Sequence, residues 1–219
     1  MAERCLAAGA QGVTIHPRPD QRHARYSDVA ALRAICDEFP GSELNIEGNP
    51  IPRFLDVVIA GKADQCTLVP DDPAQHTSDH GWDLARDGKR LIPIVERLRA
   101  AGIRVSLFLD PDPEQIRAVP ATGAERIELY TESYARAHGS SDETAVLQSF
   151  VAAARLAHEL KVGVNAGHDL NLENVGALCG AASILEVSIG HALTIESFDF
   201  GLEETIRRYL EILMEPRPS

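Results

Sequence analysis

The sequence predicts a TIM-type (β/α)8 barrel, formed as a single domain over residues 1–219. Short apolar, β-branched runs alternate with stretches of helical periodicity, which is typical of parallel α/β folds. The apolar runs outnumber the roughly five or six strands of common open sheets, and no glycine-rich dinucleotide motif follows the first run. Both observations favour a barrel over an open sheet. The expected strands lie at residues 12–16, 43–47, 65–70, 104–110, 126–131, 162–167 and 184–190.

Helix signals separate these strands. Pro52 stands where a helix begins, in the first turn that tolerates proline, and Gly102 ends an amphipathic segment. Ser140 and Glu143 have the spacing of a capping box ahead of residues 145–160. We expect helices near residues 27–39, 52–62, 89–101, 145–160 and 196–213.

The start of the chain departs from a complete barrel. Residues 2–11 resemble the end of an amphipathic helix that leads into the first strand. A helix on the outside of a barrel is expected to follow a strand, and none precedes this one. We therefore expect seven recognisable strands, with the first strand of the eight missing.

Composition narrows the partners and the compartment. A formal net charge of −12 argues against nucleic acid or an anionic membrane as a main partner. The sequence contains no run of about 18 apolar residues, so it predicts no membrane span. Residues 1–12 do not resemble a secretory signal. Cys5, Cys36, Cys66 and Cys179 match no metal or redox spacing, so we expect free thiols and a cytoplasmic protein.

Ionisable side chains gather where the strands end, which is where barrel enzymes place their active sites. His16, Glu47, His168 and His191 follow or close strands, and Glu128 lies within one. A single histidine is more often structural, but three at one barrel mouth with a glutamate favour proton transfer near neutral pH. For Glu128, an inward structural ion pair stays open as an alternative.

The last two strand-to-helix turns predict phosphate binding. Residues 165–169 and 188–192 are glycine-containing turns, and barrels bind phosphate there through backbone N–H groups. Arg18 offers a further charged contact, or else forms a salt bridge at the rim. None of the three lysines closes a strand, which argues against a Schiff-base mechanism. We expect no metal and no cofactor, although His16, His168 and His191 leave a zinc site open.

Several segments together resemble the pyridoxine 5′-phosphate synthase family. They are GVTIHPRPDQRH, LNIEGNP, CTLVPDD followed by TSDHGWD, RIELYTESYA, VNAGHDL and VSIGHAL. The resemblance runs from about residue 5 to the last expected helix and keeps the order of the motifs. It implies an enzyme that condenses 1-deoxy-D-xylulose 5-phosphate with 3-amino-2-oxopropyl phosphate. The products would be pyridoxine 5′-phosphate, inorganic phosphate and water, and family members form homo-oligomers.

The resemblance also implies roles for individual residues. His16 and Glu47 match proton acceptors, His168 a proton donor, and Glu128 a carboxylate that stabilises a transition state. The matches to substrate-binding positions are Arg18, His23 and Thr77 for the deoxyxylulose phosphate, and Asp169, Gly190 and His191 for the aminoketone phosphate. Some relatives have glycine where Asp169 stands.

The sequence has no segment that resembles the family's first strand and the substrate-binding loop after it. A shortened chain and a protein that naturally lacks this strand are both open explanations. In either case we expect impaired catalysis. Two other functions stay open: another barrel enzyme acting on triose or pentose phosphates, and an inactive barrel that serves as a binding or assembly subunit.

Overall fold

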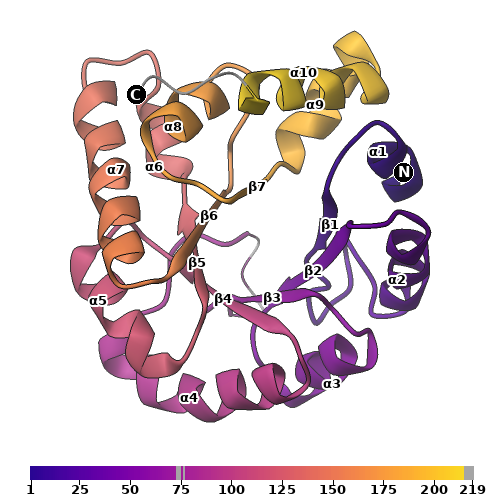
Figure 1. Cartoon of the computed structure of the whole chain (residues 1–219), viewed down its shortest axis with the longest axis vertical. Helices are drawn as coiled ribbons and strands as arrows, with labels where there is room; N and C mark the ends of the chain where they lie inside the picture. Colours follow the sequence, from indigo (N-terminus) through magenta and orange to yellow (C-terminus); the bar gives the residue numbers. More distant parts are fainter. Residues whose placement is uncertain (73–74, 76, 215–219) are drawn as a thin grey trace.

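A ring of parallel strands forms the centre of the molecule, with helices around it (Figure 1). The structure is a computed structural model that describes residues 1–72, 75 and 77–214. Its sheet follows chain order through β1 (Gly12–Ile15), β2 (Glu43–Gly48), β3 (Gln65–Leu68), β4 (Arg104–Leu109), β5 (Arg126–Tyr130), β6 (Gly163–Gly167) and β7 (Glu186–Ser188). The predicted TIM-type barrel with seven strands is confirmed.

The helices form the outer layer. They are α1 (Ala2–Ala7), α2 (Asp28–Glu38), α3 (Pro52–Ala60), α4 (Leu84–Ala100), α5 (Pro113–Thr122), α6 (Glu132–Ala137), α7 (Glu143–Glu159), α8 (Val175–Ala181), α9 (His191–Phe200) and α10 (Leu202–Met214). Among the described residues, none of these helices combines the length and apolar character needed to cross a membrane. Leu44, Ile46, Val105, Leu107 and Leu109 are fully buried and belong to the apolar core. That core holds the helices to the sheet.

The other face of the sheet, which lines the barrel, is largely polar. Because side chains alternate along a strand, Glu43, Asn45 and Glu47 share the side opposite to Leu44 and Ile46. Barrel interiors are usually filled by branched aliphatic side chains. Charged groups in this position need partners or bound protons to remain buried, so the interior is a place where protonation can be controlled.

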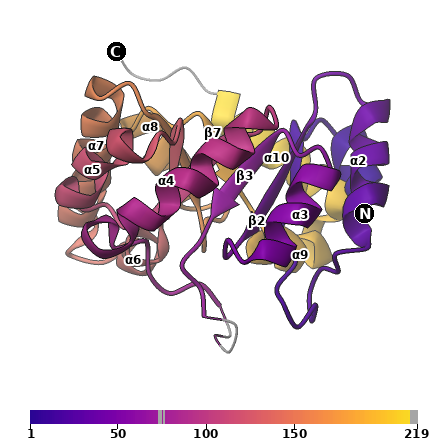
Figure 2. The same cartoon turned by 90° about the horizontal axis from the view of Figure 1, so that it is seen from below.

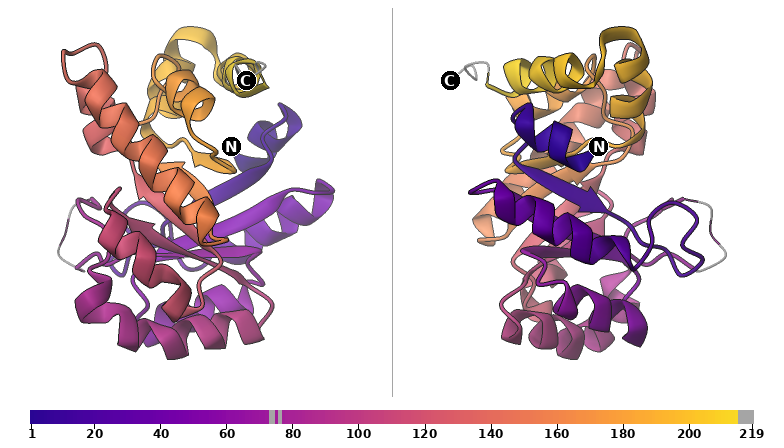
Figure 3. Two further views of the ribbon diagram at one scale, coloured as in Figure 1. Left: turned by 60° about the vertical axis from the view of Figure 1, so that its left-hand side comes forward. Right: turned by 90° about the vertical axis from the view of Figure 1, so that its right-hand side faces the viewer.

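The sheet is open between β7 and β1. Within the described residues no backbone pairing joins these two strands, although Thr14 Oγ1 lies 3.4 Å from Ser188 Oγ across the gap. The helices on either side do meet, since α10 packs against α1 (Figure 3). Arg4 Nε in α1 donates to Glu203 Oε1 in α10 over 2.7 Å. The helical layer therefore continues across a seam that the strands leave unpaired.

Three local expectations were wrong. Helix α4 begins at Leu84 instead of residue 89, because the Asp83 side chain caps it by accepting from Arg86 N. The single helix expected near 196–213 is two helices, α9 and α10, separated by Gly201 with a φ of +81°. Ser140 and Glu143 form no capping box, since the Glu143 carboxylate accepts from Gly139 N instead.

Two long connections project from one end of the barrel, the β1–α2 loop and the β3–α4 loop (Figure 2). Both follow the carboxyl ends of their strands. The residues expected to bind substrate in these loops therefore lie at the same end as His16 and His168.

Candidate active site

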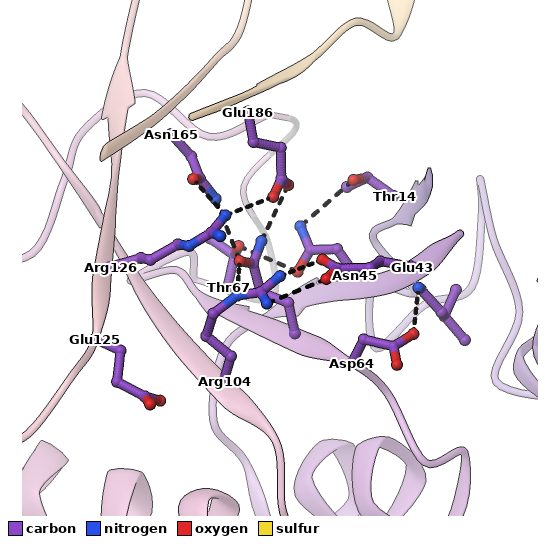
Figure 4. A network of polar contacts seen from close by, with 12 residues as sticks. Thr14, Glu43, Asn45, Asp64, Thr67, Arg104, Glu125, Arg126, Asn165 and Glu186 are labelled. Carbon is purple, nitrogen blue, oxygen red and sulfur yellow. Dashed lines mark hydrogen bonds and ion pairs between the residues drawn. The ribbon is translucent and has the colours of Figure 1, made fainter. Parts of the chain in front are cut away.

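The barrel interior is charged at the end where the strands begin, and its cations there are paired. Arg104 donates from Nη1 to Glu43 Oε1 over 3.2 Å and from Nε to Gln65 Oε1 over 2.8 Å (Figure 4). Arg126 Nη1 donates to Glu186 Oε2 over 2.9 Å. Arg104 thus neutralises Glu43, and Arg126 neutralises Glu186. Among the described residues, neither guanidinium pairs with a carboxyl group further along the barrel.

Glu47 and Glu128 occupy the next level of the interior and hydrogen-bond to each other. Thr67 Oγ1 also lies 3.3 Å from Glu128 Oε2, within donating range. Burial, followed by the charge of Glu186, raises the pKa of Glu47 to about 7. Burial, followed by the charge of Glu47, raises the pKa of Glu128 well above its usual range. The pair therefore retains at least one proton near neutral pH. This decides the alternative left open for Glu128: its side chain points inward, and its polar contacts are with Thr67 and Glu47 instead of a cation.

Glycine at position 167 leaves room for this carboxyl group. A Cβ atom at Gly167 would lie 2.2 Å from Glu128 Oε1 and 3.2 Å from Glu128 Cδ, far inside van der Waals contact. Gly167 pairs with Tyr130 at the end of β6, one strand from Glu128. The glycine of the predicted phosphate turn thus has a structural task, which is to admit the Glu128 side chain.

His16 lies at the end of β1, near Glu47. Its Nδ1 is 4.0 Å from Glu47 Oε2, beyond hydrogen-bond range. Burial, with a further contribution from the charge of Arg18, lowers the pKa of His16 to about 4. The imidazole is therefore neutral at neutral pH, which is the form able to accept a proton.

His168 is held in an unusual backbone conformation. His168 and Asp169 have φ values of +85° and +58°, in the left-handed region that non-glycine residues rarely adopt. Thr131 Oγ1 hydrogen-bonds to the carbonyl oxygens of Gly167, at 2.8 Å, and of His168. Asn174 Nδ2 donates to Asp169 O over 3.2 Å. Such strain persists where surrounding contacts over-determine it, and it is common at functional sites.

The ring of His168 is fixed at both nitrogens. Nδ1 lies 2.9 Å from Asp169 Oδ2, and Nε2 lies 3.1 Å from Thr77 Oγ1. Because a carboxylate only accepts, Nδ1 carries a hydrogen in the first contact. The edge of the imidazole also meets Tyr130, with ring centroids 4.9 Å apart. The residue predicted as proton donor is therefore oriented by the β3–α4 loop and by its own neighbour.

The remaining predicted site residues lie around this centre. Arg18 is buried and paired with Asp71 over 2.7 Å, and His23 is exposed in the β1–α2 loop. Gly190 is the N-cap of α9, and His191 is that helix's first residue. His191 and Asp169 line an open cavity together with Glu132, Ala135, Arg136, Asn171, Ala192, Ile195 and Glu196. Among the described residues, no hydrogen bond or ion pair joins His191 to Glu47 or Glu128. The site therefore has two neighbouring regions, the carboxyl pair and the cavity at His191.

The structure does not support the zinc alternative. Within the described residues no group of three or more histidine, cysteine or acidic side chains is arranged to hold a metal ion. None of the four cysteines forms a disulfide.

Residues that shape the site were not selected from the sequence. Arg104, Arg126 and Glu186 are charged residues at inward positions of strands, and their period-two spacing was a usable signal. Thr131 and Asn174 hold the turn at residues 167–169. Thr131 lies 36 residues from Gly167, and Asn174 lies 5 residues from Asp169. No local sequence pattern marks such contacts.

The fold and these groups define a β/α-barrel protein with acid–base side chains at the carboxyl ends of its strands. Comparison with known proteins identifies the family. The family model "Pyridoxal phosphate biosynthesis protein PdxJ" matches residues 1–215. A pyridoxine 5′-phosphate synthase of Allorhizobium ampelinum is 52% identical over 209 residues, covering 93% of this chain and 84% of the relative. One from Albidiferax ferrireducens is 46% identical over 222 residues, covering 99% and 88%.

This chain belongs to the PdxJ family of pyridoxal phosphate biosynthesis proteins. Solved structures of more distant proteins agree on the fold. A 3-hexulose-6-phosphate synthase structure has a TM-score of 0.62 at 14% identity, covering 97% of this chain and 94% of that one. At that identity the likeness concerns the fold alone.

Substitution of Gly167 tests the packing around Glu128. We expect Gly167→Ala to push the Glu128 carboxyl group away from Thr67 and to lower the free energy of unfolding by about 1–3 kcal/mol. A crystal structure of the variant and urea denaturation measure the two effects. Gly180→Ala is the matched control, because a Cβ in that helix meets nothing within 4 Å and alanine favours a helix. An unmoved Glu128 in the Gly167 variant would contradict the packing argument.

Proposed function

We propose that this chain condenses 1-deoxy-D-xylulose 5-phosphate with 3-amino-2-oxopropyl phosphate to give pyridoxine 5′-phosphate, inorganic phosphate and water. The observation that carries the proposal is the buried Glu47–Glu128 pair beside a neutral His16, at the mouth of a barrel whose relatives are named pyridoxine 5′-phosphate synthase. The charges and hydrogen bonds of these groups suit a reaction with several proton transfers.

The chemistry requires both an acid and a base. When the amine joins a carbonyl carbon as an imine, both hydrogens of the amine leave with the carbonyl oxygen as water. A base has to take protons from the nitrogen and an acid has to return them to the oxygen. We assign the accepting roles to His16 and Glu47, the donating role to His168, and electrostatic stabilisation to Glu128, whose proton lets it donate a hydrogen bond.

Two anion sites suit two phosphorylated substrates. We place the deoxyxylulose phosphate near Arg18, His23 and Thr77, and the aminoketone phosphate near Asp169, Gly190 and His191. Support comes from their positions, since the first group lies in the two long loops. In the second group, Asp169 and His191 line the cavity at α9, and Gly190 is the N-cap of that helix. Holding both substrates in one place reduces the entropic cost of joining them. The proposal requires no metal and no cofactor.

Synthesis of pyridoxine 5′-phosphate by the purified chain tests the proposal. Because Glu47 accepts a proton only as a carboxylate and burial raises its pKa to about 7, we expect turnover to rise with pH through that region. Glu47→Gln should lower turnover by about 100-fold or more. Glu159→Gln, on the outer helix α7, should leave it unchanged.

Three other outcomes would reject the proposal. Phosphate binding without turnover in the wild-type chain would favour a catalytically impaired barrel that acts as a binding or assembly subunit. Turnover of a triose or pentose phosphate alone would favour another phosphosugar enzyme. Full activity of Glu47→Gln would remove the assigned base.

We also propose a homo-oligomer in the cytoplasm, without nucleic acid or membrane partners. Ile195, Phe198 and Phe200 expose large apolar side chains on α9, Phe198 with 84% of its surface, and such patches mark interaction surfaces. Thiols without disulfides suit a reducing compartment. Light scattering should give a mass above that of one 23.8 kDa chain. A monomer, or recovery of the protein with membranes on cell fractionation, would contradict these expectations.

A further inference from the structure

Asp71 stands three residues after the end of β3, at the start of the β3–α4 loop, and is 3% exposed. Its Oδ2 accepts two hydrogen bonds, from Arg18 Nη2 over 2.7 Å and from Ser78 Oγ over 2.8 Å. Its Oδ1 is buried and receives none from the described residues. Asn49 Nδ2, after β2, donates to Asp71 O over 3.0 Å. The carboxylate is therefore fixed in place, and its buried charge depends on Arg18 and Ser78.

Arg18 reaches Asp71 from the other long loop. It is 6% exposed, and its Nη1 donates to Gln75 O over 3.1 Å while Nη2 holds Asp71. Arg22 Nη2 donates to the same carbonyl over 2.7 Å. One guanidinium thus ties the β1–α2 loop to two points of the β3–α4 loop. A guanidinium has five N–H donors, and among the described residues hydrogen bonds from two of its nitrogens, Nη1 and Nη2, are seen.

The same contacts determine where Thr77 lies. Thr77 stands between Gln75, whose carbonyl accepts from Arg18, and Ser78, whose hydroxyl donates to Asp71. Its Oγ1 lies 3.1 Å from His168 Nε2 across the barrel mouth. A shift of Asp71 would therefore move the arginine on one side and the threonine on the other.

We propose that Asp71 is a positioning residue of the active site, which fixes Arg18 and the Thr77 segment together as one binding end for the phosphorylated ketose. The kinetic part of this inference rests on the proposed function. Loss of the Asp71 carboxylate would leave Arg18 Nη2 without its acceptor and release Ser78, while the cavity at His191 and Asp169 would keep its own contacts.

The charge of Asp71 also acts on the neighbouring acid–base groups. It raises the pKa of both His16 and Glu47, against the effect of Arg18, which lowers both. The other charged or titratable groups that act on these two are His23 and Arg22 for His16, and Glu186 and Glu128 for Glu47. Removal of the Asp71 charge should therefore shift the rising limb of the pH–rate profile to lower pH. A purely structural residue would not move this limb.

The decisive experiment compares Asp71→Asn with the wild-type chain on both substrates. We expect the KM for 1-deoxy-D-xylulose 5-phosphate to rise about tenfold or more, since a charged hydrogen bond is lost. The KM for 3-amino-2-oxopropyl phosphate should stay within about twofold. Asp71→Glu should restore part of the affinity. Asp20→Asn, which removes a carboxylate that pairs with Arg22 at the surface, is the matched control and should behave as wild type.

A second readout does not need turnover. Limited proteolysis should cut the β3–α4 loop of Asp71→Asn several-fold faster than that of the wild-type chain, because local opening becomes easier. Ser78→Ala should show both effects more weakly, and it carries the test if the asparagine variant fails to fold. Unchanged proteolysis and affinity in the folded variants, or an equal rise of both KM values, would overturn the role of Asp71. A wild-type chain without turnover would reject the proposed function, and proteolysis with calorimetric binding of the ketose phosphate would still decide on Asp71.

Discussion

The contact between the Glu47 and Glu128 carboxyl groups is the constraint on which the site depends. The two guanidinium groups of the barrel interior are engaged by other carboxylates, Arg104 with Glu43 and Arg126 with Glu186 (Figure 4). No cation remains at hydrogen-bond distance of Glu47 or Glu128 in the described part of the chain. Two buried carboxylates in contact cannot both be charged without a large energetic cost. Charge balance in the interior thus imposes a bound proton close to neutral pH.

This constraint connects the fold to its chemistry. The apolar face of each strand holds the helices, so the inward face is free to carry charge. Gly167 gives Glu128 its space, and the same residue precedes His168, whose backbone strain is maintained by Thr131. The titratable groups of the site therefore differ in their affinity for protons, since His16 is neutral while the carboxyl pair keeps a proton. Such separation of pKa values lets one site supply acids and bases together.

The strands, and the position of the site at their carboxyl ends, were predictable because buried parallel strands have a distinct apolar pattern. Helix ends were less predictable. Asp83 caps α4 ahead of the helix's apolar periodicity, and Gly201 divides a stretch with continuous helical character into α9 and α10. The direction of Glu128 stayed open because a charge within a strand is compatible with either face. The role of Asp71 was invisible, since its partners Arg18 and Ser78 lie 53 and 7 residues away.

Infrared spectroscopy of the ligand-free chain at neutral pH tests the shared proton most directly. We expect an absorption band of a protonated, buried carboxyl group that persists at pH 7 and weakens in Glu128→Gln, where Glu47 with its pKa of about 7 still contributes. The band should disappear when Glu47→Gln is added. Replacement of Glu173, an exposed residue ahead of α8, should leave the band in place. A wild-type spectrum with only ionised carboxylates at that pH would contradict the protonated pair and the acid–base roles that follow from it.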